Sequence, residues 1–319
     1  MSPARALRIG TRGSPLALWQ ARTVANLLEA AHLRSELVII STTGDRVPDA
    51  PLSDSGGKRL FVRDIEEALL REEIDLAVHS AKDMAAVLPP GLVIAAALPR
   101  EQPHDALVLH RQVRPAGFDD TAAYLGSAPR LGTSSVRRSA QLARLFPQGA
   151  FVPIRGNVDT RLRKLDTGGY DALVLACAGL RRLGLADRIT AAVPIEHCVP
   201  APGQGIVAIE TRADDGGLRE AVRLLHDERA GLCLTAERSL VRALGGGCQV
   251  PLGGLAVHDN GRLELHAVVA SPDGRQVIRR TGRAGPLEAD TLGRQLADEL
   301  VHAGASRILD AVRRSPTGQ

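Results

Sequence analysis

The stretch Leu76-Ala77-Val78-His79-Ser80-Ala81-Lys82-Asp83 joins an apolar run directly to a cluster of polar side chains. An uninterrupted run of aliphatic residues, rather than an alternating one, is typical of a strand whose sheet is covered on both faces. Similar runs occur at 92–97, 106–109 and 206–210, and amphipathic helical patterns alternate with the apolar runs in this part of the chain. The first two-thirds of the chain therefore predicts an α/β fold with doubly wound sheets.

This alternation divides into two units of the same kind, and the change from one to the other falls at residues 101–105. In the first unit we expect strands at 7–9, 37–41, 76–79 and 92–97, and helices at 15–31 and 61–71. In the second unit we expect strands at 106–109, 130–132, 151–154 and 170–176, and helices at 135–145, 158–165 and 178–183. Pro200–Gly205 is interpreted as a hinge that leads into the strand at 206–210.

The pattern changes from residue 227 onward. We expect a helix that ends at 243, an alternating strand at 263–269, a short partner strand at 276–278, and helices from 287 to the C-terminus. Strands and helices segregated in this way predict a small α+β C-terminal domain. The expected domains are 1–104 together with 200–223, 105–199, and 224–319.

Composition limits the classes of function. At 319 residues, with 44% hydrophobic and 24% charged residues, the chain is an ordinary globular protein long enough for two or three domains. Lys and Arg together number 40, and only three of them are Lys, yet the net charge is +4. Many arginines with a small net charge favour small anionic ligands over a polyanion. Aromatic residues make up 2%, which counts against base stacking, so no nucleic-acid partner is expected.

Cysteine spacing and apolar run lengths predict the compartment. The four cysteines have no CxxC spacing, so no metal site is expected. The N-terminal segment has arginines and no apolar signal-peptide core, and no apolar run is long enough to span a bilayer. We therefore expect a cytoplasmic protein with reduced thiols and no membrane partner.

Arginine and small hydroxyl residues recur in turns that follow predicted strands. A strand, a small polar turn and a helix start together offer N–H groups, hydroxyls and guanidinium groups to a carboxylate or phosphate. A solvated surface explains any one of these arginines, but their repetition favours one multi-anionic ligand in a cleft. The residues are Arg12 and Ser14 after the first strand, Thr133, Ser134, Ser135, Arg137 and Arg138 in the second unit, Arg155 and Arg161 around a glycine turn, and Arg182.

The polar cluster Ser80, Lys82 and Asp83 follows its strand at the position where open α/β sheets bind ligands. Asp83 is a candidate to protonate a leaving group or to stabilise a neighbouring cation. The alternative is a helix-capping Asp beside a surface Lys, which the residues alone leave open. His79 is expected to be a hydrogen-bonded structural residue.

Two glycine loops stand apart from this pattern. In Gly245-Gly246-Gly247-Cys248-Gln249-Val250-Pro251, three glycines leave the thiol without bulky neighbours, which suits a covalent attachment point or a nucleophile. The alternative is a tight turn beside a buried Cys. The segment Gly56-Gly57-Lys58-Arg59-Leu60-Phe61 ends a polar loop, for which a lid over the cleft and an ordinary surface loop both stay open.

Taken together, these blocks resemble the porphobilinogen deaminases, also called hydroxymethylbilane synthases. The blocks Ile9–Gln20, Val78–Asp83, Gly132–Arg138, Arg155–Leu165, Pro200–Gly205 and Gly245–Pro251 stand in the order and approximate spacing of that family. Several blocks in one order are far more specific than a single motif. The resemblance runs nearly end to end, and it implies two periplasmic-binding-protein-like domains around a hinge and a third domain that carries a cofactor.

The resemblance implies a transferase of tetrapyrrole (haem and porphyrin) biosynthesis. Such an enzyme joins four porphobilinogen molecules head to tail, with release of ammonia, into linear hydroxymethylbilane. A dipyrromethane cofactor would be held by a thioether to Cys248, beside Gly247. Asp83 would be the catalytic residue, assisting loss of the amino group and stabilising cationic azafulvene and pyrrole intermediates. The family also implies a monomer.

The resemblance also assigns the remaining polar residues to the carboxylates of the pyrrole rings. The residues implied to bind the cofactor are Ser80, Lys82, Thr133, Ser134, Ser135, Arg137 and Arg138, with Gly247 beside Cys248. Those implied to bind substrate are Arg12, Ser14, Lys58, Phe61, Arg155, Arg161, Arg182 and Gln204.

The chain departs from the family pattern at three places. Asp54 stands where a Lys is frequent, Arg59 replaces a usual Gly, and Met84-Ala85 replace a common Val-Pro pair. These departures leave Asp83 and Cys248 in place, and no binding role is transferred to Asp54. A two-lobed protein that binds an anionic ligand without chemistry is the alternative, and it explains neither the Gly-Gly-Gly-Cys loop nor the third domain.

Overall fold

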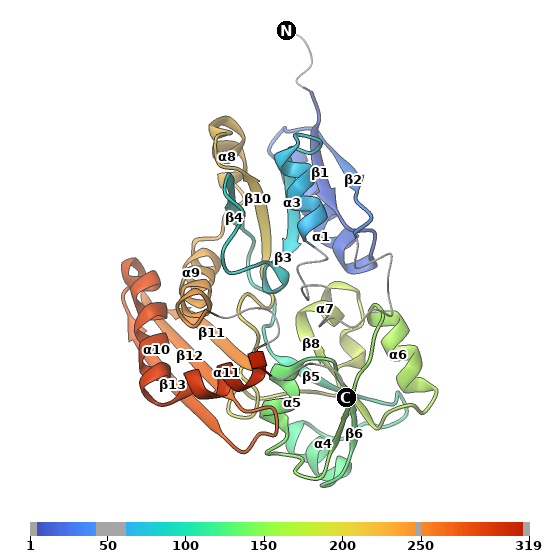
Figure 1. Ribbon diagram of the computed structural model, residues 1–319. Helices are drawn as coiled ribbons and strands as arrows, with labels where there is room; N and C mark the ends of the chain where they lie inside the picture. The colour runs from blue at the N-terminus through green and yellow to red at the C-terminus, as the bar shows by residue number, and fades with distance from the viewer. Residues whose placement is uncertain (1–4, 43–61, 246–249, 315–319) are drawn as a thin grey trace.

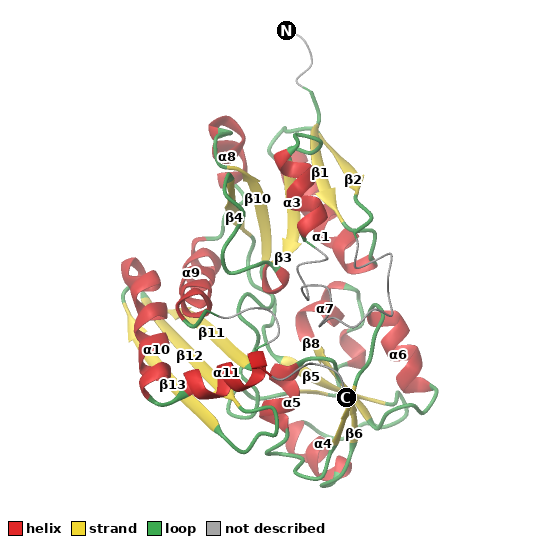
Figure 2. Ribbon diagram, viewed as in Figure 1, coloured by secondary structure: helices red, strands yellow, loops and turns green. Residues whose placement is uncertain are grey.

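The computed structural model describes residues 5–42, 62–245 and 250–314, and within these ranges the chain forms three separate β-sheets. Figure 1 shows the first α/β unit at the top, the second at the lower right, and the third sheet with its helices at the lower left. Figure 2 shows that helices flank the strands in all three parts. The prediction of two α/β units and a small α+β domain is therefore confirmed.

The first sheet has the strand order β2-β1-β3-β10-β4. Strands β1, β2 and β3 pair in parallel, whereas β10 runs antiparallel between β3 and β4. In Figure 1 the yellow β10 returns to a sheet whose other strands are blue to cyan. The strands are β1 (Leu7–Thr11), β2 (Ser35–Ile39), β3 (Leu76–Ser80), β4 (Leu92–Ala97) and β10 (Val207–Arg212).

Strand β3 shows why its sequence lacks polar alternation. Leu76 and Val78 are buried against α1 (Pro15–Ala30), whereas Ala77 belongs to a buried cluster with α3 (Arg63–Leu70). Successive side chains of a strand point to opposite faces, so helices on both faces require apolar residues at every position. Among the described helices of this unit, α8 (Gly216–Arg223) also packs on the α1 side, through Leu218 and Val222.

The second sheet repeats this arrangement with the order β7-β6-β8-β5-β9. Strand β5 is the antiparallel member, between β8 and β9, and its Leu107 and Val108 enter two different core clusters. The elements are β5 (Asp105–Leu109), α4 (Phe118–Leu125), β6 (Arg130–Gly132), α5 (Val136–Leu142), β7 (Ala150–Val152), α6 (Val158–Asp166), β8 (Ala172–Ala176), α7 (Cys177–Arg182) and β9 (Ala191–Ala192).

The two large sheets are joined by two crossing segments. The chain leaves the first sheet after β4 and enters the second as β5, and it leaves the second after β9 and re-enters the first as β10. In each sheet the antiparallel strand is thus the one that arrives from the other sheet. Both crossings pass between the sheets, so residues 98–104 and 193–206 form the only described covalent connections there.

The third sheet is antiparallel, with the order β11-β12-β13. Its hairpin between β11 and β12 turns at Asn260 and Gly261, whose φ angles are +49° and +73°, as a two-residue turn of this kind requires. Leu265 and Leu296 belong to one core between the sheet and its helices. The elements are α9 (Glu228–Ala243), β11 (Leu252–Asp259), β12 (Arg262–Ala270), β13 (Val277–Ala284), α10 (Ala289–His302) and α11 (Ala305–Arg314).

Four elements were not expected from the sequence: α4, α8, β9 and β11. Strand β11 contains Gly253-Gly254, which weakens the strand signal. A Cβ at Gly253 would lie 2.7 Å from the carbonyl oxygen of Val199. This position therefore needs glycine, because the hinge segment passes close to the strand there. The strands of the three sheets come from 7–97 with 207–212, from 105–192, and from 252–284. The finer domain bounds remain a prediction.

Candidate active site

The hinge segments enter both large sheets at the edge where the parallel strands end. Ser80 ends β3 and pairs with Val207, the first residue of β10. In the second sheet, Ala176 ends β8 and pairs with Asp105, the first residue of β5. Ligands of open α/β sheets bind outside the carboxyl ends of the strands, so the two edges and the hinge between them form the candidate site.

Asp83 follows β3 in a short 3-10 helix, Ala81–Asp83, where it is half-buried. The hinge packs directly against this turn at Gly203, whose φ is +76°. A Cβ at Gly203 would lie 2.9 Å from the amide nitrogen of Lys82, so only glycine fits both the backbone angle and the space. The hinge sequence therefore helps to fix the position of the Asp83 turn.

Lys82 is connected to the second sheet through the side chain of Gln204. The Lys82 Nζ donates a hydrogen bond of 3.2 Å to Gln204 Oε1. Gln204 Nε2 in turn donates to Asp105 Oδ1 at 3.0 Å and to the Pro103 carbonyl at 2.6 Å. Because Gln204 is 1% exposed, this link is shielded from water. One buried amide thus joins the neighbour of Asp83 to the first residue of β5.

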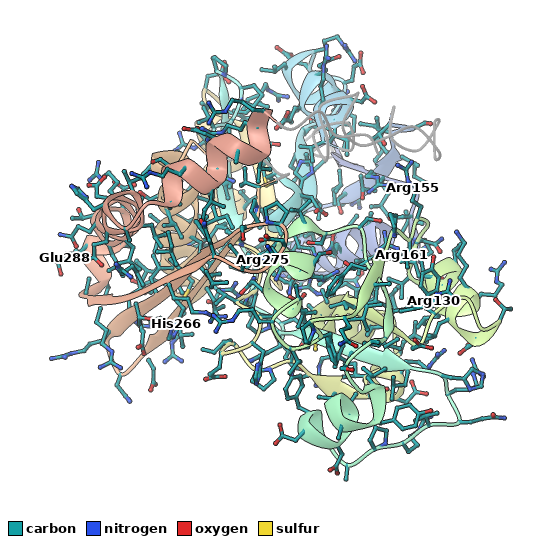
Figure 3. The ribbon with its side chains drawn as sticks, turned by 60° about the horizontal axis from the view of Figure 1, so that its bottom comes forward. Arg130, Arg155, Arg161, His266, Arg275 and Glu288 are labelled. Atoms are coloured by element: carbon teal, nitrogen blue, oxygen red, sulfur yellow. The ribbon has the colours of Figure 1, made fainter. Side chains whose placement is uncertain are left out.

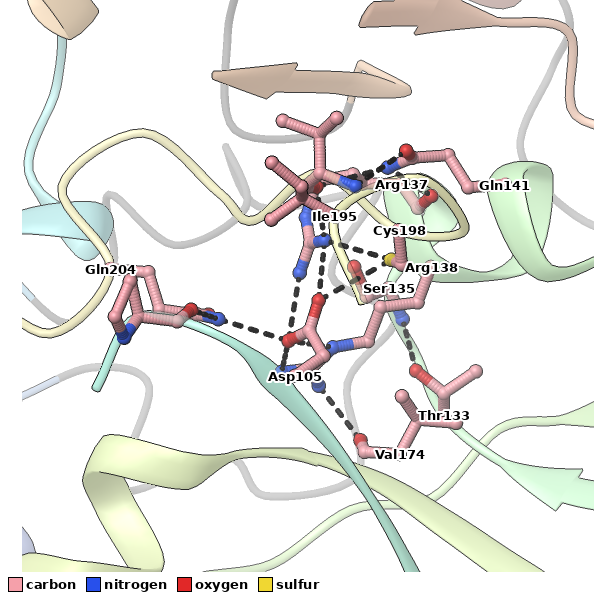
Figure 4. Close-up of polar contacts among 12 residues, drawn as sticks. Asp105, Thr133, Ser135, Arg137, Arg138, Gln141, Val174, Ile195, Cys198 and Gln204 are labelled. Atoms are coloured by element: carbon pink, nitrogen blue, oxygen red, sulfur yellow. Dashed lines mark hydrogen bonds and ion pairs between the residues drawn. The ribbon is translucent and has the colours of Figure 1, made fainter. Parts of the chain in front are cut away.

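Asp105 is the centre of the polar cluster in Figure 4. Arg137 donates to it from Nη1 at 2.6 Å and from Nη2 at 3.2 Å. Arg138 donates to its Oδ1 from Nε at 2.9 Å and from Nη2 at 2.7 Å. Both guanidinium groups also bind main-chain oxygens, those of Val199 and Val174. The carboxylate therefore holds two arginines from the start of α5 in fixed orientations.

Charge in this cluster is only partly balanced. Burial alone would raise the pKa of Asp105, but the charges of Arg137 and Arg138 outweigh it and hold that pKa well below its ordinary value. Burial likewise opposes the charge of Arg137, and Asp105 more than restores it, so the pKa of Arg137 is raised. Two cations face one anion, so the cluster keeps an excess positive charge that suits a further carboxylate.

The turn that precedes α5 is tied to the loop that carries Arg155. Ser134 Oγ donates to the Ile154 carbonyl at 2.8 Å and accepts from the Ile154 amide at 3.0 Å. Thr133 Oγ1 accepts from the Ser135 amide at 3.2 Å. The Ser134 hydroxyl therefore links the turn after β6 to the loop after β7, whereas the Thr133 hydroxyl makes its contact within its own turn. In the described structure both hydroxyls thus make backbone contacts.

Arg161 lies within the electric field of both Asp83 and the arginine cluster. Burial lowers its pKa to about 10, repulsion from Arg138 adds to this effect, and attraction by Asp83 opposes it. Its Nε donates to the Gly156 carbonyl at 2.8 Å, which turns the guanidinium back toward its own loop. Figure 3 shows Arg155 and Arg161 on the side of the second unit nearer the blue and cyan ribbon of the first.

The remaining predicted residues lie on the first sheet's edge or on the hinge. Ser80 Oγ accepts from Gln20 Nε2 at 2.8 Å, and Ser14 Oγ accepts from the Ala17 amide at 3.3 Å and so caps α1. Arg12 follows β1, which is parallel to β3, so it shares the edge with Ser80. Arg182 Nη2 donates to the Gly205 carbonyl at 2.6 Å, which brings α7 against the hinge.

Four predicted site residues lie outside the described residues: Lys58, Phe61, Gly247 and Cys248. The structure does describe the start of the loop that carries Cys248. Arg313 Nη2 donates to the carbonyls of Leu244 at 3.1 Å and Gly245 at 2.7 Å. The C-terminal helix α11 therefore holds the end of α9 from which this loop departs.

Helix α9 is also anchored at the hinge. Arg100 donates to both carboxylate oxygens of Glu237, at 2.6 and 3.3 Å, and to the main chain of Gln204 at 2.8 Å. The fully buried Glu237 also accepts from the amides of Gly203, at 2.5 Å, and Ala256, at 2.7 Å. The third sheet is thus attached to the segment that positions Lys82 and Asp105.

Sequence reasoning missed four residues of this arrangement: Gln20, Arg100, Asp105 and Glu237. In the sequence, Asp105 marks only the point where the chain changes from the first unit to the second. A single Asp before an apolar strand gives no signal of its two distant arginine partners. The same is true of Glu237, whose contacts come from three segments far from it in sequence. Only the fold brings these charges together.

Other features of the described residues bear on the predicted chemistry. Within them no group of His, Cys, Asp and Glu is arranged to hold a metal ion. His79 Nε2 lies 3.1 Å from a carboxylate oxygen of the buried Glu210. Cys177, Cys198 and Cys233 are free and buried, and burial raises the pKa of Cys198 to about 12. Among the helices that can be examined, none has the length and apolar character to cross a membrane.

Solved structures with a related architecture are only distantly similar. The VFT2 domain of Bordetella pertussis BvgS is 15% identical, with a TM-score of 0.40, over 68% of this chain and 84% of that one. An arginine 3rd transport system periplasmic binding protein from Legionella pneumophila is 13% identical, with a TM-score of 0.40, over 70% and 92%. The fold assignment rests on the strand order and pairing described above.

Sequence comparison covers nearly the whole chain. Residues 7–220 match the family model of the porphobilinogen deaminase dipyromethane cofactor binding domain, and residues 231–302 match that of the porphobilinogen deaminase C-terminal domain. The porphobilinogen deaminase of Syntrophobacter fumaroxidans is 46% identical over 98% of this chain and 99% of its own. That of Syntrophomonas wolfei is 44% identical over 97% and 100%. The chain belongs to the porphobilinogen deaminase family.

Proposed function

We propose that this chain joins four porphobilinogen molecules head to tail into hydroxymethylbilane, as a transferase of tetrapyrrole biosynthesis. In each condensation the C–N bond of an aminomethyl group breaks and ammonia leaves. A C–C bond then forms to the free α-carbon of the preceding ring, which loses its proton. After the fourth addition, water breaks the bond between the product and the primer and supplies the hydroxyl group of hydroxymethylbilane. The observation that carries the proposal is the single polar chain from Lys82, beside Asp83, through Gln204 and Asp105 to Arg137 and Arg138.

The residues of the site fit a dipyrromethane group chemically. Acetate and propionate side chains on its rings need cations that are partly desolvated and held in place. Arg137 and Arg138 meet both conditions, because they are 5% and 8% exposed and outnumber their one carboxylate partner. When bound, the dipyrromethane cofactor supplies the primer ring to which the first porphobilinogen is joined.

Asp83 is the proposed acid and the stabiliser of positive charge. It follows the end of β3, in a turn fixed by Gly203, and faces Arg161 electrostatically. In this role it gives a proton to the departing amino nitrogen, and as a carboxylate it then balances the cation left on the ring. Lys82, whose ammonium group is held by Gln204, precedes Asp83 in the same turn.

The other charged residues are proposed to hold ring carboxylates rather than to react. Arg155 and Arg161 come from the glycine turn and the helix α6 that follows it, Arg182 comes from the end of α7, and Arg12 comes from the first sheet. Several fixed cations place each ring in one orientation, which brings the reacting carbons together. Ser80 is proposed to act with them, since its hydroxyl is already oriented by Gln20. We also propose that substrate is bound by Lys58, Phe61 and Ser14.

Cys248 is proposed to carry the cofactor through a thioether. Support comes from its place after α9, whose end is held by Arg313 and whose middle is held by Glu237 at the hinge. The deciding measurement is the intact mass of the purified chain beside Cys248→Ser. We expect an excess of two pyrrole units in the parent and none in the variant.

The same measurement separates enzyme from ligand binder. An unmodified parent that gains the two-unit mass after porphobilinogen is added is an apoenzyme, and the proposal stands. An unmodified parent that gains no mass and releases no ammonia would overturn it. We further propose a cytoplasmic protein, because its three described thiols are free and buried, and a monomer, which the molar mass in light scattering tests.

A further inference from the structure

A hollow with a volume of about 360 Å³ lies between α1 and α7, beside the site described above. Pro15, Trp19 and Thr23 line it from α1, and Arg182 and Leu183 line it from the end of α7. This volume lies at the lower end of the range of small-molecule sites, which suits one ring with short side chains. The hollow is thus large enough for a single small ligand.

The hollow combines an aromatic surface with two cations. Trp19, the only tryptophan of the chain, is 37% exposed, and the guanidinium carbon of Arg182 lies 5.5 Å from the centroid of its ring. Arg182 is fixed a second time by the Gly205 carbonyl at 2.6 Å. Arg22, one turn along α1 from Trp19, lines the same space. Arg22, Arg182 and the ring of Trp19 therefore line the same space.

Neither cation is neutralised by a close carboxylate of the described residues. No described ion pair includes Arg22 or Arg182, and none of the residues that line the hollow is acidic. Burial lowers the pKa of Arg182, and the charge of Glu101 opposes this effect. The Glu101 carboxylate itself forms an ion pair with Arg181 at 3.1 Å. A carboxylate entering the hollow would meet two cations, one of them partly desolvated and held in place.

We propose that this hollow is a docking site for a carboxylated pyrrole, with Trp19 contacting the ring and Arg22 and Arg182 binding its two acidic side chains. The inference rests on the proposed function, because porphobilinogen is a flat ring with an acetate and a propionate. The hollow adjoins the reaction centre. Arg182 donates a hydrogen bond to the carbonyl of Gly205, and the preceding residue, Gln204, accepts a hydrogen bond from Lys82. Asn26 adds a neutral donor at its wall, and the Thr23 hydroxyl, which donates to the Trp19 carbonyl at 2.9 Å, adds an acceptor.

Two sources of this chemistry exist: incoming porphobilinogen and the last ring of the growing chain. Because the chain has one tryptophan, its fluorescence reports on the hollow alone. Rapid mixing of the holoenzyme with porphobilinogen should change that fluorescence. A phase whose rate rises with porphobilinogen concentration and precedes ammonia release identifies the incoming substrate. A phase at the rate of ammonia release identifies the growing chain.

The matched variants are Arg22→Gln, in the hollow, and Arg307→Gln, an exposed arginine of α11 with no described side-chain partner. We expect Arg22→Gln to raise KM about 5- to 30-fold with little change in kcat, and to weaken the fluorescence change in parallel. Arg307→Gln should match the parent in both. A structural defect in Arg22→Gln would lower the melting temperature, so that temperature is measured as well.

The outcomes separate this inference from the proposed function. If the parent releases ammonia but its fluorescence stays constant, or if Arg22→Gln keeps the parental KM, kcat and fluorescence change, the docking site is refuted and the enzyme assignment stands. If the parent releases no ammonia and makes no hydroxymethylbilane, the proposed function itself fails. A fluorescence change that Arg22→Gln abolishes, at an unchanged melting temperature, supports the site.

Discussion

The Asp105 carboxylate accepts a hydrogen bond of 2.6 Å from the Arg137 guanidinium, and the two side chains are 0% and 6% exposed. Arg138 binds the same carboxylate from the next position of α5. A buried charge that loses its partner keeps the desolvation cost without the attraction that offset it. This relationship therefore matters to stability as well as to the arrangement of the site.

Replacing Asp105 with Asn should destabilise the fold strongly. The change leaves two buried guanidinium groups without their common anion, and breaking a buried pair of this kind costs about 3–5 kcal/mol. The free energy of unfolding from urea titration checks this value. Asp310→Asn is the control, because its pair with Arg313 is exposed and exposed pairs contribute about 0–1 kcal/mol. Equal effects of the two changes would contradict the role of Asp105.

The same carboxylate predicts a dependence of stability on pH. The pKa of Asp105 is depressed in the folded state, so the unfolded chain binds more protons than the folded one below the ordinary Asp pKa of about 4. The stabilisation is therefore complete above that pH and is lost as pH falls toward the folded-state value. Urea unfolding between about pH 5 and pH 3 should show a steeper loss in the parent than in Asp105→Asn.

Removing the acid group of Asp83 should abolish most turnover without unfolding the chain. Asp83→Asn keeps the size of the side chain but cannot donate the proton, and loss of a positioned general acid costs about 10²- to 10⁴-fold in rate. Ammonia release measures the rate, and circular dichroism measures the fold. Asp119→Asn, on the exposed face of α4, should keep the parental rate. Near-parental turnover of Asp83→Asn would remove Asp83 from this role.

Replacing Arg155 with Leu should stop cofactor assembly or an early condensation. Its loop is held beside the arginine cluster through Ser134 and Ile154, so the loss of a cation there removes one carboxylate contact. Intact-mass spectra should show chains with fewer pyrrole units than the parent carries. Arg163→Leu, on the exposed side of α6, is the control and should give parental masses. If Arg155→Leu forms full-length product at the normal rate, the assignment of Arg155 to carboxylate binding is wrong.

The three described thiols should resist alkylation in the native protein. Burial raises the pKa of Cys177 and Cys198 to about 12 and that of Cys233 to about 11, and the thiolate is the reactive form. Treatment with iodoacetamide at pH 8 followed by peptide mass mapping should find these three cysteines unmodified. All three should be labelled in urea, which shows that the reagent can reach them once the core opens.

Local sequence determined much of this fold, because its signals are short-range. Apolar runs such as Leu76–Val78 specify a strand covered on both faces, and Ser14-Pro15 specifies the start of α1, where the structure has it. The family could be identified for the same reason, since the blocks around Asp83 and Cys248 are contiguous in the chain. In contrast, the sequence did not predict β11. Its two glycines weaken the strand signal, and they are required by close contact with the hinge, which lies far away in the sequence.

Tertiary structure alone decided how the charges are shared. Arg137 and Arg138 were predicted to bind ligand carboxylates, and nothing near them in sequence shows that Asp105 already binds both. Gln204 was predicted to bind substrate, and the fold places it between Lys82 and Asp105. Secondary structure depends on neighbours within a few residues, whereas a buried ion pair depends on which distant segments the strand order brings together. The order of residues therefore determined the elements and the family, and the packing of the two sheets around their hinge determined the electrostatics of the site.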